Sequence, residues 1–239
     1  MIALEFKKEK RTGITLILFL TGILGALYVL LNFKIRGETL LNMPLDPMDI
    51  LLTQLYGMIM ILNMFALIVT TSIAYSMEFT GTAIKKMYVL PVKMWKIYLA
   101  KFLIIVTMLF VAILLQNVAL AWIGSTKLPQ GQFEVGELVN YSVYTFITSL
   151  PVLSFMLMIS SFFENIWVTL GIGVAGFLSG MAFATAGSNV KLIHPFIVMF
   201  KPAIEMTAQT NVNTIIVALV ETIVFLALGI IISEKKKVE

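Results

Sequence analysis

The chain has 239 residues, of which 59% are apolar and 13% are charged, and it carries a net charge of +4. This composition excludes a water-soluble globular protein and leaves no length for a large soluble domain beside the apolar runs. The absence of cysteine excludes disulfides and thiolate metal sites.

Six stretches are long and apolar enough to cross a membrane as helices, because about 20 apolar residues at 1.5 Å rise each span the hydrocarbon core. The charged N-terminus leads into the first stretch without a small-residue cleavage site, so we expect that stretch to be retained. The sequence therefore predicts an all-α polytopic membrane protein with a single transmembrane domain over residues 1–239. The six predicted spans are residues 14–33, 51–76, 97–123, 141–163, 166–186 and 213–232.

The lysine and arginine residues decide the orientation of these spans. Six crossings place both termini on one side, together with the connection after the second span, and twelve of the seventeen basic residues fall there. Since basic residues are retained on the inner side, both termini are predicted to be cytoplasmic in the plasma membrane, and the charge needs no nucleic acid to explain it. On the other side, residues 34–49 and 127–140 have the composition of polar loops. The turn at 164–165 is so short that spans four and five are predicted to pack as an antiparallel hairpin.

Residues 1–12 mix apolar and basic side chains and predict an interfacial helix. Its apolar side chains would lie in the headgroup layer, while Lys7, Lys8, Lys10 and Arg11 would face anionic lipid. The alternative is a simple topology anchor.

Between the second and third spans lies a basic connector, with a predicted short helix over residues 79–91. Lysines at four positions keep the connector out of hydrocarbon, and Pro91 ends the short helix. One apolar stripe on this helix indicates that it docks onto a partner. The stripe comprises Phe79, Ala83, Ile84, Met87 and Tyr88, and the lysines are Lys85, Lys86, Lys93 and Lys96.

Residues 187–212 form an outer segment that contains the apolar run LIHPFIVMF at 192–200. This run is too short to span a membrane and too apolar for a solvated loop, so a re-entrant segment is predicted, with a surface loop as the alternative. His194, Pro195 and Phe196 are its candidate outer-gate residues.

Four polar residues within the spans are candidates for a substrate path: Asn63, Gln116, Asn117 and Glu221. Amides at such depth commonly hydrogen-bond between helices, so packing is the alternative for the first three. Glu221 is a functional candidate because an ionisable group at mid-membrane is costly. A structural glutamate that ties helices together is the alternative.

Catalytic motifs are missing from the sequence. It contains no GxxxxGK[ST] nucleotide cradle, no HExxH, no GxSxG and a single histidine. We therefore expect neither an enzyme nor a metal or cofactor on this chain.

The connector resembles that of the permease subunits of type-2 ABC exporters. The likeness lies in Glu78, the pair Gly81 and Thr82, the pair Leu90 and Pro91, and the trailing Lys101. It departs from the family where Val92 and Lys93 replace the usual Ser or Arg after the Leu-Pro pair. Within that family, the chain length and the N-terminal LEFKKEKRTG are similar to the lantibiotic-immunity permeases.

The resemblance implies a transport subunit that works with an ABC ATPase, which binds ATP and Mg²⁺, and with a second six-span permease chain, identical or related. It implies export of an amphipathic substrate, here a lantibiotic or bacteriocin-type peptide, through a wall in contact with membrane lipid. Alternatives are type-2 export of another peptide, drug or lipid, and an ion- or proton-coupled carrier or channel that uses Glu221. By the resemblance, the residues that couple to the ATPase are Glu78, Phe79, Gly81, Thr82, Ile84, Lys85, Lys86, Met87, Pro91 and Lys101.

Overall fold

Helices account for all the regular structure in the described part of the chain. The computed structural model describes residues 2–79, 93–184 and 193–235. In chain order the elements are α1 (Ile2–Thr12), α2 (Ile14–Leu41), α3 (Pro47–Asp49), the π-helix η1 (Ile50–Gln54), α4 (Tyr56–Phe79), α6 (Met94–Lys127), α7 (Val135–Phe162), α8 (Ile166–Ala184), α9 (Pro195–Ile204) and α10 (Val212–Lys235).

Six helical segments are long and apolar enough to cross a membrane, counting α3, η1 and α4 as one continuous segment. The prediction of an all-α protein with six membrane-crossing helices is confirmed. The predicted polar loops at 34–49 and 127–140 are partly wrong, because α2 continues to Leu41 and α7 already begins at Val135. A helix of 28 residues is about 42 Å long, whereas the hydrocarbon core is about 30 Å thick. Hydropathy therefore marks only the middle of each helix.

The second crossing begins differently from the prediction. Asp46 caps α3 by accepting a hydrogen bond from the Met48 amide at 3.0 Å, and Pro47 occupies the first turn. Residues 50–54, in which the predicted span starts, form the π-helix, and regular α-helix starts only at Tyr56. The wider π turn inserts a local irregularity at the entry to α4.

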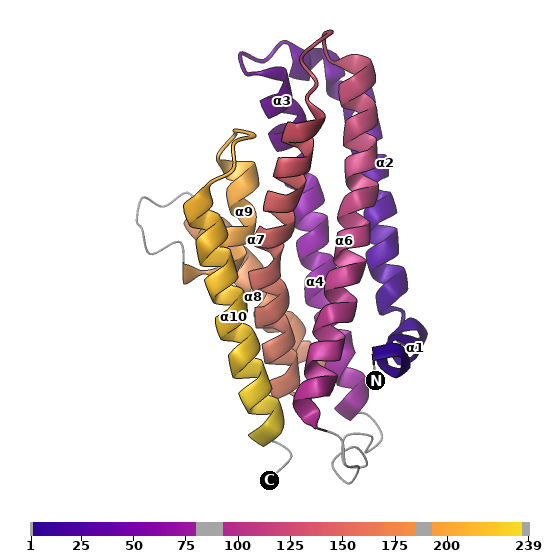
Figure 1. The fold of residues 1–239 in the computed structure, drawn as a ribbon, viewed down its shortest axis with the longest axis vertical. Helices are drawn as coiled ribbons and strands as arrows, with labels where there is room; N and C mark the ends of the chain where they lie inside the picture. The colour runs from indigo at the N-terminus through magenta and orange to yellow at the C-terminus, as the bar shows by residue number, and fades with distance from the viewer. Residues whose placement is uncertain (1, 80–92, 185–192, 236–239) are drawn as a thin grey trace.

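The helices form an upright bundle in which α1 lies at one end and α3 at the other (Figure 1). We call these the α1 end and the α3 end. The C-terminal part of α10 also lies at the α1 end (Figure 1), as an even number of crossings requires. Gly13 separates α1 from α2 and has a φ of 82°, a left-handed conformation that glycine adopts without strain. This residue lets α1 turn away from the axis of α2.

The core forms where α2, α4 and α6 pack together, and α7 joins them to α10. The predicted hairpin of spans four and five is only partly right: a short turn joins α7 to α8, but α8 packs mainly against α9 and α4. The small residues Gly176 and Gly180 of α8 explain this, since Phe196 of α9 fills the space that their side chains would occupy. The short helix α9 is thus inserted into the bundle, and residues 195–200 are all buried.

Candidate functional site

A buried ammonium group surrounded by three carboxylates lies at the α1 end. Lys101, in the third turn of α6, has a side chain that is 1% exposed. Its Nζ atom lies 2.8 Å from Glu9 Oε1, 2.9 Å from Glu78 Oε1 and 3.3 Å from Glu5 Oε2. Burying a cation is costly unless anions compensate the lost hydration. The three carboxylates provide this compensation, and we call the group the Lys101 cluster.

The carboxylates come from two helices far apart in the sequence. Glu5 and Glu9 are four residues apart on α1, so they lie on one face of that helix. Glu78 is the next-to-last residue of α4 and also accepts a hydrogen bond from Lys8 of α1. The Lys101 cluster therefore joins α1 to the last turn of α4 and to the first turns of α6. These are the two helix ends between which the basic connector runs.

The charges of the cluster do not balance. Among the described residues, Glu5, Glu9 and Glu78 face the ammonium groups of Lys8 and Lys101, which leaves one surplus negative charge when all five are ionised. Burial raises the pKa of Glu9, and this desolvation outweighs the attraction of Lys101, while the two neighbouring carboxylates raise the pKa further. Glu9 therefore takes up a proton at a higher pH than an exposed glutamate does.

Two tyrosines cover the cluster on the side of the bundle core. The Nζ atom of Lys101 lies 5.6 Å from the ring centroid of Tyr75, within the range of a cation–π interaction. The Tyr75 ring lies 6.3 Å from that of Tyr98, which is fully buried. Aromatic packing thus extends the Lys101 cluster from α4 and α6 toward α10.

The C-terminal part of α10 contacts the same region at two points. Gly229 packs so closely on Tyr98 that a Cβ atom there would overlap the tyrosine hydroxyl. Glu234 accepts a hydrogen bond from the Trp95 amide at 3.1 Å, in the first turn of α6. A carboxylate at a helix N-terminus is stabilised by the free amides and by the helix dipole. Four elements, α1, α4, α6 and α10, therefore converge at the α1 end.

Three of the residues predicted to couple to an ATPase are described. Glu78 and Lys101 pair directly with each other, and Phe79 is half-buried at the end of α4 with its ring 6.5 Å from that of Tyr75. The other predicted coupling residues fall in 80–92, outside the described residues: Gly81, Thr82, Ile84, Lys85, Lys86, Met87 and Pro91.

Sequence reasoning missed the acidic face of α1. It assigned Lys8 to anionic lipid, which is wrong because Lys8 pairs with Glu78, and it gave Glu5 and Glu9 no role. One signal was present, since two glutamates at i and i+4 in a helix rich in lysine form an acidic face. The partner of that face lies more than ninety positions along the chain.

With this geometry in view, comparison with protein families identifies the chain. Residues 1–180 match the family described as ABC-2 family transporter protein. The chain belongs to the ABC-2 transporter family. Comparison with curated proteins and with solved structures gave no match.

Membership in the ABC-2 family, together with the six apolar helices, makes the chain a multi-pass membrane permease of an ABC transporter. Permeases of this family are transport subunits rather than catalytic ones, and the family implies an ABC ATPase as partner. The matched residues include α1, α4 and α6, and so every charged member of the Lys101 cluster.

Two of the predicted path residues of this ABC-2 permease bond to each other. Asn63 of α4 donates to Gln116 Oε1 at 3.0 Å, and Gln116 of α6 donates to Asn63 Oδ1 at 2.8 Å. Gln116 also donates to the Thr21 carbonyl of α2 at 3.3 Å, and both amides are buried. This arrangement joins α2, α4 and α6 at mid-bundle, and a place on a substrate path stays a prediction for both residues.

The other two predicted path residues have unpaired acceptors. Asn117 donates to the Ile113 carbonyl of its own helix at 2.8 Å, and its Oδ1 atom is buried without a hydrogen-bond partner among the described residues. Glu221 of α10 is 9% exposed, and both of its carboxylate oxygens are unpaired in the described part of the chain. Their role in transport remains a prediction.

The candidate outer gate lies at the start of α9. His194 precedes the helix, and its Nε2 atom lies 3.1 Å from the Ser179 hydroxyl of α8. Pro195 is the first helical residue, and the Phe196 ring packs edge-on against that of Phe155 in α7, with centroids 6.1 Å apart. Burial lowers the pKa of His194, so its imidazole is neutral at physiological pH. A gating role for this segment remains a prediction.

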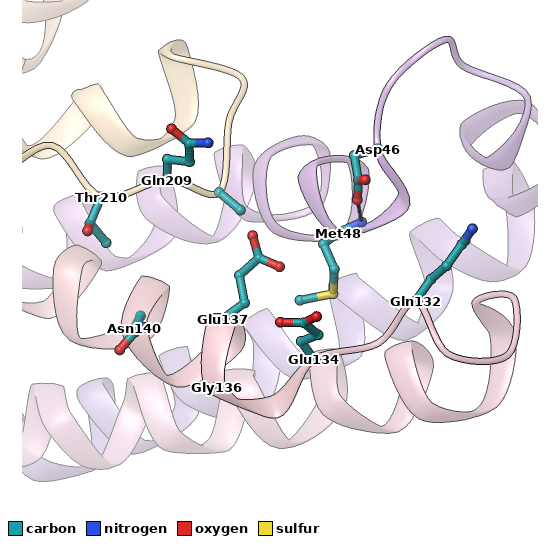
Figure 2. Close-up of a pocket in the computed structure, with 10 residues that line it drawn as sticks. Asp46, Met48, Gln132, Glu134, Gly136, Glu137, Asn140, Gln209 and Thr210 are labelled. Atoms are coloured by element: carbon teal, nitrogen blue, oxygen red, sulfur yellow. Dashed lines mark hydrogen bonds between the residues drawn. The ribbon is translucent and has the colours of Figure 1, made fainter.

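An acidic cavity of about 660 Å³ lies at the α3 end. Figure 2 shows the carboxylates of Glu134 and Glu137, from the start of α7, on one side and Asp46, before α3, on the other. Gln209 and Thr210 from the segment before α10 complete the wall (Figure 2). Three carboxylates around one hollow attract cationic groups. No set of acidic, histidine or cysteine side chains among the residues described is arranged to hold a metal ion.

Proposed function

We propose that this ABC-2 permease exports an amphipathic peptide of the lantibiotic or bacteriocin type and so gives its cell immunity to that peptide. A separate ABC ATPase, which binds ATP and Mg²⁺, drives it from the α1 end. A second six-span chain, identical or related, completes the pathway.

The observation that carries this proposal is the Lys101 cluster. Its ion pairs join α1 to the helix ends on both sides of the connector. Separating one partner from a buried charge network costs about 3–5 kcal/mol. A partner that pushes on the connector therefore moves the ends of α4 and α6 together with α1, as one body. Such rigid transmission is what a permease driven by an external ATPase needs.

The distribution of charge supports a cytoplasmic location of the α1 end. Twelve basic residues fall on that side and five on the other. Lys101 is buried within the cluster and is neutralised there, but eleven against five still favours the same orientation. The connector then faces the compartment that holds ATP.

The acidic cavity at the α3 end supports the proposal that the substrate is cationic. The cavity lined by Asp46, Glu134 and Glu137 would lie on the outer side in this orientation. A concave acidic surface raises the local concentration of cationic groups. A basic amphipathic peptide is thus favoured over an anionic substrate, in agreement with the resemblance of the N-terminal segment to lantibiotic-immunity permeases.

Co-purification tests the coupling part of this proposal. The tagged permease is extracted with mild detergent from the cells that produce it, and Mg²⁺-dependent ATP hydrolysis is measured in the eluate. We expect hydrolysis with the wild type and none with Ile84→Asp, which places a charge on the apolar stripe of the connector. Val135→Asp, an exposed position at the α3 end, is the matched control and keeps the activity. Undiminished hydrolysis with Ile84→Asp would remove the coupling role of the connector.

A survival assay tests the substrate. Cells that contain the permease and its ATPase are exposed to a lantibiotic-type peptide, and cells that lack the permease are compared with them. We expect lower survival without the permease. Equal survival would refute the peptide as substrate while leaving the coupling result intact.

A further inference from the structure

Glu221 is the one acidic side chain of the described bundle that sits at mid-membrane depth with no partner. It lies near the middle of α10, and its side chain is nine-tenths buried. Neither carboxylate oxygen has a hydrogen-bond partner among the described residues. A buried carboxyl without a donor is costly. Such a group in a membrane helix therefore indicates a ligand that supplies the missing donor.

The carboxyl lines an apolar groove on the surface of the bundle. The groove has a volume of about 460 Å³, within the range of about 300–1,000 Å³ typical of small-molecule sites. Val220 and Val224, on its rim, are 54% and 47% exposed, so the groove opens toward the hydrocarbon of the bilayer. Its other walls are aliphatic or aromatic: Ile193, Ile216, Val217 and Phe225.

The chemistry of the groove selects one class of occupant. Lipid acyl chains would cover the apolar walls but provide no donor for Glu221. A hydroxyl provides a single donor, whereas an ammonium provides three donors and a compensating charge. Hydrogen bonds between a carboxylate and a cation are also the stronger kind.

We propose that this groove binds the amine-bearing part of a cationic amphiphile, with Glu221 accepting from the ammonium group and the aliphatic walls covering the apolar part. This inference rests on the proposed function, because the natural occupant would be a lysine or amino-terminal segment of the exported peptide. The groove would be the place where the substrate is taken from the bilayer. It lies on the lipid-facing side of α10 rather than between the helices of the core.

A matched pair of probes tests the groove without the ATPase. The purified permease in detergent is titrated with a dansylated long-chain primary amine and with the same molecule carrying a hydroxyl in place of the amine. Binding is followed by the rise in dansyl fluorescence. We expect the amine to bind about tenfold more tightly or better, which corresponds to about 1.4 kcal/mol or more.

Two variants locate the site. In Glu221→Gln the preference for the amine is lost while the hydroxyl probe binds as before. In Val224→Trp the larger side chain fills the groove, and both probes bind more weakly. Glu164→Gln, at an exposed position in the turn before α8, is the matched control and keeps the full preference. Each variant is first checked for a single symmetric peak in size-exclusion chromatography.

The outcomes separate this inference from the proposed function. Equal affinity of the two probes for the wild type would overturn the inference, as would an amine preference that survives in Glu221→Gln. Failure of both probes to bind to the wild type would also overturn the inference. A change of oligomeric state in Val224→Trp would then assign the groove to a second chain. ATP hydrolysis that still co-purifies with the permease would then leave the coupling proposal standing.

Discussion

Replacing Lys101 with methionine tests the idea that the Lys101 cluster holds the α1 end together. Methionine has a similar length and keeps the aliphatic packing, but it removes the only ammonium among the described residues that contacts all three carboxylates. Of the described lysines, only Lys8 then remains paired with one of these carboxylates, that of Glu78. Breaking a buried ion pair by removing one partner typically costs about 3–5 kcal/mol.

This loss is large enough to measure by thermal unfolding. For a chain of this size, 1 kcal/mol shifts the midpoint by about 2–4 °C, so we expect Lys101→Met to lower it by roughly 6–20 °C. The intrinsic fluorescence of the three tryptophans in detergent provides the signal. Lys127→Met is the control, because Lys127 is exposed at the α3 end and forms no ion pair within the described residues. A change there is expected to stay within about 0.5 kcal/mol.

A double variant tests whether the charges of the Lys101 cluster interact. Glu9→Gln removes the surplus negative charge, so the combination of Lys101→Met with Glu9→Gln should be less destabilised than the sum of the two single changes. Strict additivity, or a midpoint for Lys101→Met equal to that of the Lys127→Met control, would refute a functional coupling among these charges.

Three further predictions follow from the described contacts. Because burial raises the pKa of Glu9 above its ordinary value of 4.5, the folded state holds a proton that the unfolded state has lost, and stability should fall as the pH rises from 4.5 through the raised pKa. Thermal midpoints measured from pH 4.5 upward should show a flatter slope in Glu9→Gln, and an unchanged slope would contradict this. Gly229→Ala should destabilise by about 1–3 kcal/mol because its Cβ would overlap the Tyr98 hydroxyl; Tyr98→Phe should relieve part of that loss, and a neutral Gly229→Ala would contradict the close packing. Asn63→Leu should cost about 1–2 kcal/mol by leaving the Gln116 amide unpaired; adding Gln116→Leu should cost little more, whereas full additivity in a denaturant titration would show that the two amides act independently.

Two residues of the family pattern at the connector contact each other in the structure. Glu78 and Lys101 were singled out as part of a family pattern, and they form an ion pair of 2.9 Å. The pattern alone does not reveal that α1 supplies two more carboxylates to the same ammonium. The sequence predicts the N-terminal helix as an element on the membrane surface, whereas its acidic face pairs with Lys101 inside the protein.

The ends of the helices could not be predicted from hydropathy, although their apolar middles could. The apolar middle of each span was predictable because hydropathy and length are properties of local sequence. The ends of α2, α4 and α7 were not, because polar residues continue a helix as readily as they form a loop once the helix has left the hydrocarbon. Likewise, the short turn before α8 predicted a hairpin, and the insertion of α9 against Gly176 and Gly180 gave α8 different neighbours.

The sequence by itself determined that this protein is all-α, crosses the membrane six times and carries no nucleotide-binding or metal-binding motif of its own. These conclusions depend on residue type and spacing within single segments, which are read without knowing which segments touch. Only the tertiary structure decided that Glu5, Glu9, Glu78 and Lys101 share one buried site and that Glu221 lines an apolar groove with no hydrogen-bond partner among the described residues. The free energy of a charge near a helix end depends on the groups around it, and in this fold those groups lie as many as ninety-six residues away along the chain.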